Sequence, residues 1–201
     1  MPRTELLFLG LIGAVALERL VELVLSTRNA RRAFAAGGVE AEGRGAYAAM
    51  VVTHALFLVA APLEVVLLAR PFVPLLGGPM LALAAGAMAL RYWAIATLGA
   101  RWTTRVIVVP GAAAVDSGPY RYLRHPNYLA VIVELAALPL VHSAWLTALL
   151  VSAANAELLR RRIACEERAL ARHADYAARL GDRPRLLPGL PAAAARLPEP
   201  R

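Results

Sequence analysis

The feature that most constrains this fold is a series of apolar stretches, each about as long as a membrane is thick. Residues 6–25, 47–69 and 75–98 are mostly apolar, and a helix needs about 20 such residues to cross the hydrocarbon core of a bilayer. The chain is 59% apolar and 18% charged, whereas soluble domains average about 45–50% apolar and about 25% charged residues. We therefore expect a polytopic helical membrane protein.

A further pair of apolar stretches follows a break in this pattern. Residues 129–140 and 144–159 are apolar, the first is too short to span alone, and Pro139 to Ser143 between them has the composition of a turn. We expect a helical hairpin whose first leg begins at Pro126, because proline is favoured at the first position of a helix. The fold class predicted is all-α, with about five transmembrane helices, the last two forming this hairpin.

The segment after the hairpin is charged but keeps a helical pattern. Residues 160–180 are therefore expected to continue the last helix out of the membrane as a cytoplasmic helix, which ends at Gly181 to Pro184. The tail beyond Leu187 is rich in Pro and Ala, and we expect it to be loose.

The connections between the apolar stretches differ in charge. Ser26–Ala46 and Gly99–Tyr128 are expected to be loops rich in Arg, whereas the turn Arg70–Pro74 has one Arg and the tip of the hairpin has none. Basic loops stay in the cytoplasm, so the five crossings place the N-terminus outside and the C-terminus in the cytoplasm. The net charge of +8 then suits anionic lipid headgroups rather than nucleic acid.

The first apolar stretch carries charges. Glu18 and Glu22 share one helical face, and Arg19 is placed to pair with Glu22. Charges inside a span are costly and normally face protein or water. Two interpretations remain open here: an inward-facing cluster, or an interfacial position near the helix end.

Signatures of soluble enzymes are missing from the sequence. It has no GxGxxG after a strand, no P-loop, no GxSxG and no HExxH. The four histidines show no spacing with Cys or acids that is typical of metal ligands, so no metal is predicted. Cys165 is the only cysteine, which excludes an intrachain disulfide.

One polar segment stands out at the expected membrane surface. It runs from Gly118 to Tyr128, and Arg162 and Glu166-Glu167 join it on the same side after the hairpin. The helix start at Pro126 offers free N–H groups and a positive dipole end to an anion. Tyrosine faces suit a sulfonium, and Glu166 is able to accept hydrogen bonds from hydroxyl or ammonium groups. Each residue also has an ordinary structural interpretation, as an interfacial anchor or an i, i+4 surface pair.

This arrangement resembles the isoprenylcysteine carboxyl methyltransferase family. The resemblance covers about Val106 to Pro188 and rests on Gly118-Pro119-Tyr120, on Arg124-His125-Pro126-Asn127-Tyr128, and on Glu166-Glu167 followed by Leu170 and Tyr176. More closely, the chain is similar to the bacterial branch that methylates alkylpyrones and alkylresorcinols, which are phenolic lipids. Glu18-Arg19 and Ser26–Arg32 support that branch.

The resemblance implies S-adenosylmethionine as methyl donor, a lipophilic or prenylated acceptor that enters from the bilayer, and the bacterial inner membrane as location. Residues 1–201 would form one membrane-embedded methyltransferase domain: three spans in 1–98, the cofactor loop, hairpin and C-terminal helix in 99–188, and a loose tail in 189–201. Cofactor contacts are expected at Ala112, Ala113, Ala114, Val115, Tyr120, His125, Pro126, Asn127, Tyr128 and Glu166. Arg162 matches the family's substrate-contacting arginine and is the expected catalytic residue.

One departure bears on the acceptor. The eukaryotic prenylcysteine enzymes carry a His where this chain has Ala112, which weakens the case for a prenylated protein as acceptor. A carboxylate or an acidic enol needs no base, whereas a phenol, with a pKa near 10, needs one or needs its anion stabilised. Arg162 is suited to stabilise such an anion. His125, Glu134 and His142 are the candidate bases, and Glu134 has the alternative interpretation of a buried packing contact.

Other functions share parts of this pattern. NADPH-dependent sterol-type reductases also carry an Arg/His-Pro-Asn-Tyr motif before a membrane hairpin, but they usually have Glu at the position of Val131 and lack the Glu166-Glu167 pair. Phospholipid N-methylation shares the donor and the membrane. A non-enzymatic scaffold leaves the cytoplasmic motif without a purpose.

Overall fold

A computed structural model of the chain describes residues 2–173 and 175–187. Five long helices dominate it: α1 (Arg3–Ala35), α2 (Arg44–Leu67), α3 (Pro74–Leu98), α4 (Pro126–Leu140) and α5 (Trp145–His173). Shorter elements are β1 (Val39–Glu40), η1 (Gly99–Arg101), β2 (Ile107–Val108), η2 (Gly118–Arg121) and α6 (Tyr176–Leu180).

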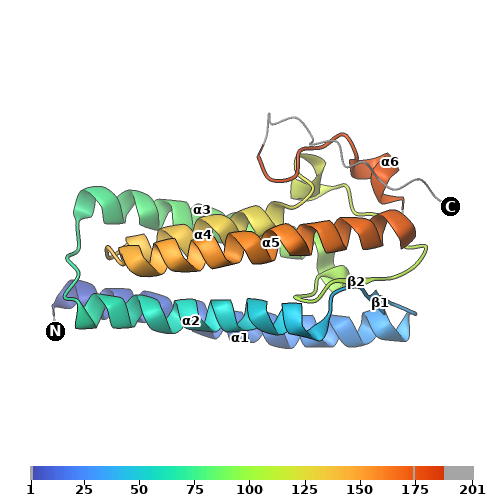
Figure 1. Cartoon of the computed structure of the whole chain (residues 1–201). Helices are drawn as coiled ribbons and strands as arrows, with labels where there is room; N and C mark the ends of the chain where they lie inside the picture. The colour runs from blue at the N-terminus through green and yellow to red at the C-terminus, as the bar shows by residue number, and fades with distance from the viewer. Residues whose placement is uncertain (1, 174, 188–201) are drawn as a thin grey trace.

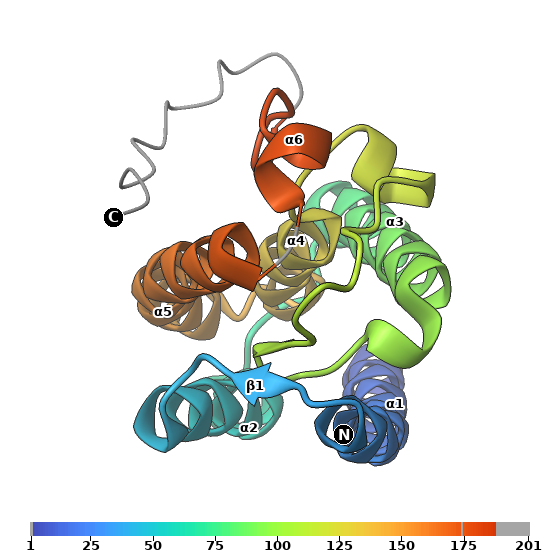
Figure 2. The same ribbon diagram turned by 90° about the vertical axis from the view of Figure 1, so that its right-hand side faces the viewer.

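The long helices form a bundle of two layers (Figures 1 and 2). One layer holds α1 and α2, and the other holds α3, α4 and α5. Within and between the layers, α4 packs on α3 and α5, α5 packs on α2, and α1 packs on α2. All five run along one direction, so the connections gather at two ends (Figure 1). The α2–α3 and α4–α5 turns lie at one end, and β1, β2, η2 and α6 lie at the other.

Apolar side chains cover the outside of the bundle as well as its centre. Phe57, Leu135 and Leu138 are at most 2% exposed in the core. Large apolar residues are nevertheless exposed on four helices, among them Leu17, Val24, Leu56, Val59, Leu63, Leu81, Leu83, Leu149 and Leu150. Two segments, Arg44–Leu67 and Pro74–Arg101, are long and apolar enough to cross a membrane. A surface of this kind fits lipid better than water.

The first predicted loop is wrong over much of its length. Residues from Ser26 to Ala35 continue α1 instead of leaving it, and α2 already begins at Arg44. Arg and Ala are good helix formers, and no glycine occurs between Ser26 and Gly37. Gly37 adopts φ +80° just after the helix. The polar side chains have partners: Asn29 Nδ2 donates to the carbonyl oxygen of Trp102 at 2.8 Å.

The all-α prediction needs a small correction. Val39 pairs with Val108 and Glu40 with Ile107 in a two-stranded antiparallel sheet. These two-residue strands join the α1–α2 connection to the long loop before α4. Sequence periodicity does not reveal strands of this length, because alternation needs about four residues to be recognised.

The later elements follow the prediction more closely. Helix α4 begins at Pro126, as expected, and Val141–Ala144 connects it to α5. Helix α5 extends beyond the apolar stretch to His173, but α6 is a separate helix rather than its continuation. Helix α6 ends at Leu180, before the predicted stop. The predicted loose tail, residues 189–201, lies outside the described residues.

The charges of the first helix face the interior of the bundle. Arg19 lies 2.5 Å from Glu22 and 2.5 Å from Glu134 of α4. Arg91 of α3 donates to both oxygens of Glu22, each at 2.6 Å. Glu134 is 3% exposed, which supports its interpretation as a buried contact. Of the two interpretations left open by the sequence, the structure supports the inward-facing cluster.

Candidate functional site

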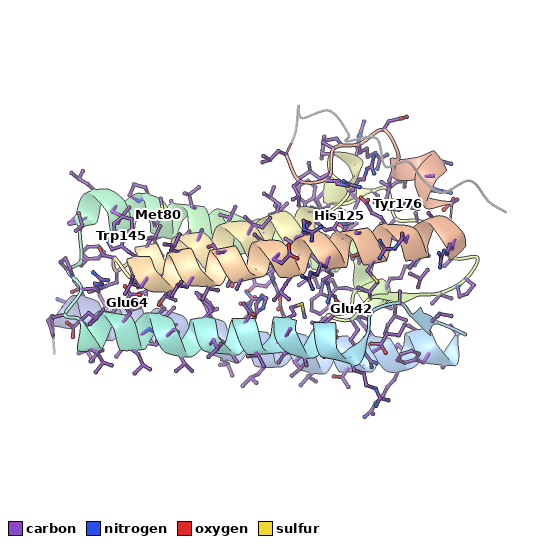
Figure 3. The ribbon with its side chains drawn as sticks, viewed as in Figure 1. Glu42, Glu64, Met80, His125, Trp145 and Tyr176 are labelled. Carbon is purple, nitrogen blue, oxygen red and sulfur yellow. The ribbon has the colours of Figure 1, made fainter. Side chains whose placement is uncertain are left out.

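A cavity of about 1140 Å³ opens at the end of the bundle where β1, β2 and α6 lie. Helices α1, α2, α4 and α5 line it, together with the long loop between α3 and α4. Figure 3 shows Glu42, His125 and Tyr176 near this end, whereas Glu64 and Trp145 lie at the opposite end.

The predicted site residues come together around this cavity. Its lining includes Arg162 and the following expected cofactor contacts: Ala112, Ala113, Ala114, Val115, Tyr120, His125, Asn127, Tyr128 and Glu166. Pro126 is the exception, because it is buried at the first position of α4 and does not line the cavity. Its effect is to fix where the helix starts.

Arg162 is held by three groups from different parts of the chain. Its Nη1 lies 2.5 Å from Glu42 Oε2, its Nη2 donates to the carbonyl oxygen of Thr104 at 2.6 Å, and its Nε donates to the Tyr128 hydroxyl at 3.0 Å. The side chain is 7% exposed. A guanidinium fixed on all sides in this way is a pre-organised positive charge at the cavity wall.

Glu166 and Tyr128 form the next contact along the wall. The Tyr128 hydroxyl donates to Glu166 Oε2 while it accepts from Arg162. The chain Arg162–Tyr128–Glu166 thus links the expected substrate arginine to an expected cofactor carboxylate. Linked hydrogen bonds of this kind polarise one another in a low dielectric.

The second glutamate of the pair, Glu167, has a structural role. Its oxygens accept from Arg185 Nη2 at 2.5 Å and lie 3.2 Å from His125 Nε2. Burial by itself would raise the pKa of Glu167, but the hydrogen bonds from His125 and Arg185 outweigh it and lower the pKa to about 2. This carboxylate therefore fixes the His125 ring, which stacks on Tyr128 with centroids 5.3 Å apart.

The segment after α6 packs back onto the motif. The backbone N–H groups of Arg124 and His125 donate to the carbonyl oxygens of Pro184 and Arg185 at 2.9 and 3.0 Å. Arg124 Nε donates to the carbonyl oxygen of Arg183 at 2.7 Å. The described part of the C-terminal segment thereby holds the start of α4 in place.

The small-residue segment Ala112–Val115 is anchored by Asp175, which directly precedes α6, and by Arg101 of η1. Asp175 Oδ1 accepts from the Ala114 N–H at 2.7 Å, and Arg101 Nη1 donates to the Ala113 carbonyl oxygen at 2.6 Å. The hydrogen bond from the Ala114 N–H, followed by that from Arg179, lowers the pKa of Asp175. Short side chains leave the backbone of this segment accessible from the cavity.

Two polar atoms in the cavity wall have no partner among the residues described. These are Asn127 Oδ1 and Trp102 Nε1, and both are buried. Buried polar atoms are almost always hydrogen-bonded, so an acceptor and a donor left open here suit a polar ligand. Within the described ranges, no group of three or more His, Cys, Asp or Glu is placed to hold a metal ion.

The three candidate bases lie in different places. His142 is at the far end of the bundle between Phe8 and Phe72, with ring centroids 5.5 and 5.8 Å away. Glu134 is paired with Arg19. His125 lines the cavity but is engaged by Glu167.

Sequence reasoning missed Glu42, Thr104 and Trp102. Glu42 and Arg162 are 120 positions apart, and Glu42 lies in a stretch interpreted as a polar loop. One signal in the sequence could have indicated Glu42: it is an acidic residue in an Arg-rich loop, and that loop is expected on the same side of the membrane as the motif.

Comparison with known proteins gives two similarities. The profile of the isoprenylcysteine carboxyl methyltransferase (ICMT) family matches residues 80–172. The chain is also 36% identical over 165 residues to the uncharacterised protein YpbQ of Bacillus subtilis (strain 168), an alignment that covers 82% of this chain and 96% of the relative.

The matched region contains α4, most of α3 and α5, and the cavity wall between them. The fold is helical, with two segments long and apolar enough to cross a membrane, and the family match defines the class as a membrane-associated methyltransferase. The chain belongs to the isoprenylcysteine carboxyl methyltransferase family.

Proposed function

We propose that the protein is an integral membrane methyltransferase that uses S-adenosylmethionine to methylate an oxygen of a lipid-like acceptor. The observation that carries the proposal is the single cavity into which nine of the ten expected cofactor positions and Arg162 converge. These positions come from the long loop, α4 and α5, which are separate in sequence. Family membership supports methyl transfer.

S-adenosylmethionine supplies a methyl group that is already activated on a sulfonium centre. The residues of the cavity fit such a group: Glu166 offers a carboxylate to hydroxyl or ammonium groups, Asn127 Oδ1 is an open acceptor, and Trp102 Nε1 is an open donor. Tyr120 adds an aromatic face. Burial, with the nearby Glu166 carboxylate, raises the pKa of Tyr120, so its hydroxyl stays protonated.

The main task of the remaining residues is alignment. Fixing two reactants in a reactive geometry is worth up to about 7–11 kcal/mol, and a site with little water strengthens every electrostatic contact. Arg162, held by Glu42, Thr104 and Tyr128, is the residue we assign to the acceptor oxygen. Its positive charge favours the anionic form of that oxygen.

The far part of the cavity supports a lipid acceptor. Its lining between α1 and α2 includes the apolar side chains Leu20, Leu23, Met50 and Leu58, beside the paired charges Arg19, Glu22 and Arg91. A hydrocarbon chain fits this part while a polar head lies near Arg162. The two acceptor classes we propose are a prenylcysteine-type carboxylate and the hydroxyl of an alkylpyrone or alkylresorcinol, and Ala112 favours the second class.

The same arrangement supports a multi-pass topology in a bacterial inner membrane. All five long helices run between the two ends of the bundle (Figure 1). The cavity end carries Arg32, Arg101, Arg105, Arg124 and Arg161 in its lining. By the positive-inside rule that end is cytoplasmic, which places the start of α1 outside. We propose one membrane-embedded domain over residues 1–201, with spans in 1–98 and the cofactor region in 99–188.

The test is equilibrium binding of S-adenosylmethionine and of NADPH to the purified protein in nanodiscs. We expect S-adenosylmethionine to bind and Glu166→Ala to weaken it at least tenfold. The matched control is Glu157→Ala, which should bind S-adenosylmethionine normally. Glu157 is an exposed residue of the same helix, and its carboxylate contacts Arg160 and Arg161. Binding of NADPH alone would move the assignment to a reductase. Binding of neither ligand would refute both the methyltransferase and the reductase assignment.

A further inference from the structure

Glu42 is a buried carboxylate that the assigned roles leave unexplained. It follows β1, its side chain is 5% exposed, and it lines the cavity. Its Oε2 accepts from Arg162 Nη1 at 2.5 Å. Within the described part of the chain, its second oxygen, Oε1, receives no hydrogen bond, so one lone-pair face of a buried acid remains available.

A neighbouring glutamate shows what a purely structural pair looks like. Glu40, two residues earlier, binds Arg105 through both oxygens, and its side chain is 20% exposed. Both of its oxygens are engaged and it does not line the cavity. Glu42 differs in all three respects: it is buried, half-engaged and at the cavity wall.

The charged groups around Glu42 come from several elements. Arg162 and Glu166 face it from α5, Glu40 lies beside it on β1, and the Tyr128 hydroxyl of α4 joins the same network through Arg162. Burial raises the pKa of Glu42; Arg162 opposes this, and Glu166 and Glu40 add to it. A base with a raised pKa is better matched to taking a proton near neutral pH than an ordinary carboxylate.

We propose that Glu42 is the catalytic residue that takes the proton from a hydroxyl acceptor, with Arg162 stabilising the oxygen as it becomes anionic. This rests on the proposed function. The acceptor O–H bond breaks and its proton moves to Glu42 Oε1. The acceptor oxygen forms a bond to the methyl carbon as the carbon–sulfur bond of the donor breaks, and that bonding pair stays on sulfur. The products are a methyl ether, a neutral thioether and protonated Glu42.

The geometry also sets a substrate class. A phenol, with a pKa near 10, is almost wholly protonated at neutral pH and gains from a base beside it. An acidic enol or a carboxylate is already ionised and gains little. The pairing of Glu42 with Arg162 therefore points to weakly acidic hydroxyls of phenolic lipids as acceptors that this site is equipped to use.

The experiment compares two acceptors in nanodiscs: a 5-alkylresorcinol, which is a phenol, and a 4-hydroxy-6-alkyl-2-pyrone, which is an acidic enol. Methyl transfer from labelled S-adenosylmethionine is measured for wild type, Glu42→Gln and the matched control Glu40→Gln. Glu42→Gln should lower kcat/KM for the resorcinol about 100–1000-fold and for the pyrone less than about tenfold. The control should retain both activities.

Two further readouts separate catalysis from structure. The Kd for S-adenosylmethionine should be the same in Glu42→Gln and wild type, and the fall of resorcinol methylation at low pH should disappear in the variant. Equal loss with both acceptors, or lost S-adenosylmethionine binding, would make Glu42 structural and overturn the proposal. A wild type that methylates only the pyrone would also overturn it, since no base is then needed. A wild type that binds no S-adenosylmethionine would instead refute the proposed function.

Discussion

The carboxylate of Glu64, on α2, accepts a 2.7 Å hydrogen bond from the backbone N–H of Thr147, in the first turn of α5. It also accepts from the Leu146 N–H at 3.1 Å and from the Thr147 hydroxyl at 2.8 Å. Helix α5 begins at Trp145, so these are N–H groups that its own helix leaves free. One helix thus caps another, at the end of the bundle away from the cavity (Figure 3).

Replacing Glu64 should destabilise the α2–α5 junction. Glu64→Ala leaves the buried Thr147 N–H and the partly buried Leu146 N–H without their acceptor, and an unsatisfied buried group costs about 1–3 kcal/mol. We expect a clear fall in the thermal midpoint in detergent, with S-adenosylmethionine affinity little changed below that midpoint. Glu157→Ala on α5 is the control and should melt like wild type. A wild-type midpoint for Glu64→Ala would mean that water replaces the cap.

The buried ion pairs predict a second, coupled effect. Glu134 lies 2.5 Å from Arg19 and 3.8 Å from Arg91. Glu134→Leu removes one carboxylate but leaves both guanidinium groups inside the bundle, and breaking a buried pair in this way costs about 3–5 kcal/mol. Adding Arg19→Met to Glu134→Leu should recover part of the lost free energy of unfolding, because one of the unpaired guanidinium groups is then removed. A double-mutant cycle of unfolding free energies measures this, and strictly additive losses would contradict the coupling.

The sequence was most informative where one physical rule dominates. Long apolar stretches predicted α2 and α3 because a helix is the usual way to satisfy backbone groups in lipid. Pro126 marked the start of α4 through its fixed φ and missing N–H. Most of the expected site residues line one cavity at the end of the bundle where the Arg-rich connections lie, and the arginine counts predicted that these connections share one side.

Other features depend on contacts that no local pattern encodes. The polar residues after Ser26 looked like a loop, but Asn29 and Ser26 bond to the loop near Trp102 and Thr104, which keeps α1 helical. The strands β1 and β2 are too short to leave a period. The Glu42–Arg162 contact joins positions 120 apart, and a single sequence does not show which acid meets which arginine.

The lowered pKa of Glu167 predicts how stability depends on pH. The pKa lies at about 2 in the folded protein, below the ordinary value of 4.5. The ionised carboxylate therefore stabilises the fold at pH values above 4.5, and this contribution is lost as the pH falls toward 2. Compared with wild type, Glu167→Gln should be less stable at pH 6, and the gap should close on acidification. Unfolding curves between pH 6 and pH 2.5 measure it; a constant gap would contradict the prediction.

Arg162 provides the sharpest separation of binding from turnover. It contacts Glu42, Thr104 and Tyr128. Among the expected cofactor contacts, its hydrogen bonds reach Tyr128 directly and Glu166 only through Tyr128, and we expect its charge to act mainly on the acceptor. Arg162→Ala should lower kcat at least 100-fold, as expected when charge stabilisation in the transition state is lost, while the Kd for S-adenosylmethionine changes less than about fivefold. Arg162→Lys keeps the positive charge but loses the forked N–H donors of the guanidinium, so its kcat should lie between those of Arg162→Ala and wild type. Arg160→Ala is the matched control and should behave as wild type, because the Arg160 side chain is 72% exposed and does not line the cavity. Equal losses of turnover and cofactor affinity in Arg162→Ala would refute the acceptor role, because they would show that the guanidinium mainly holds the cavity wall together.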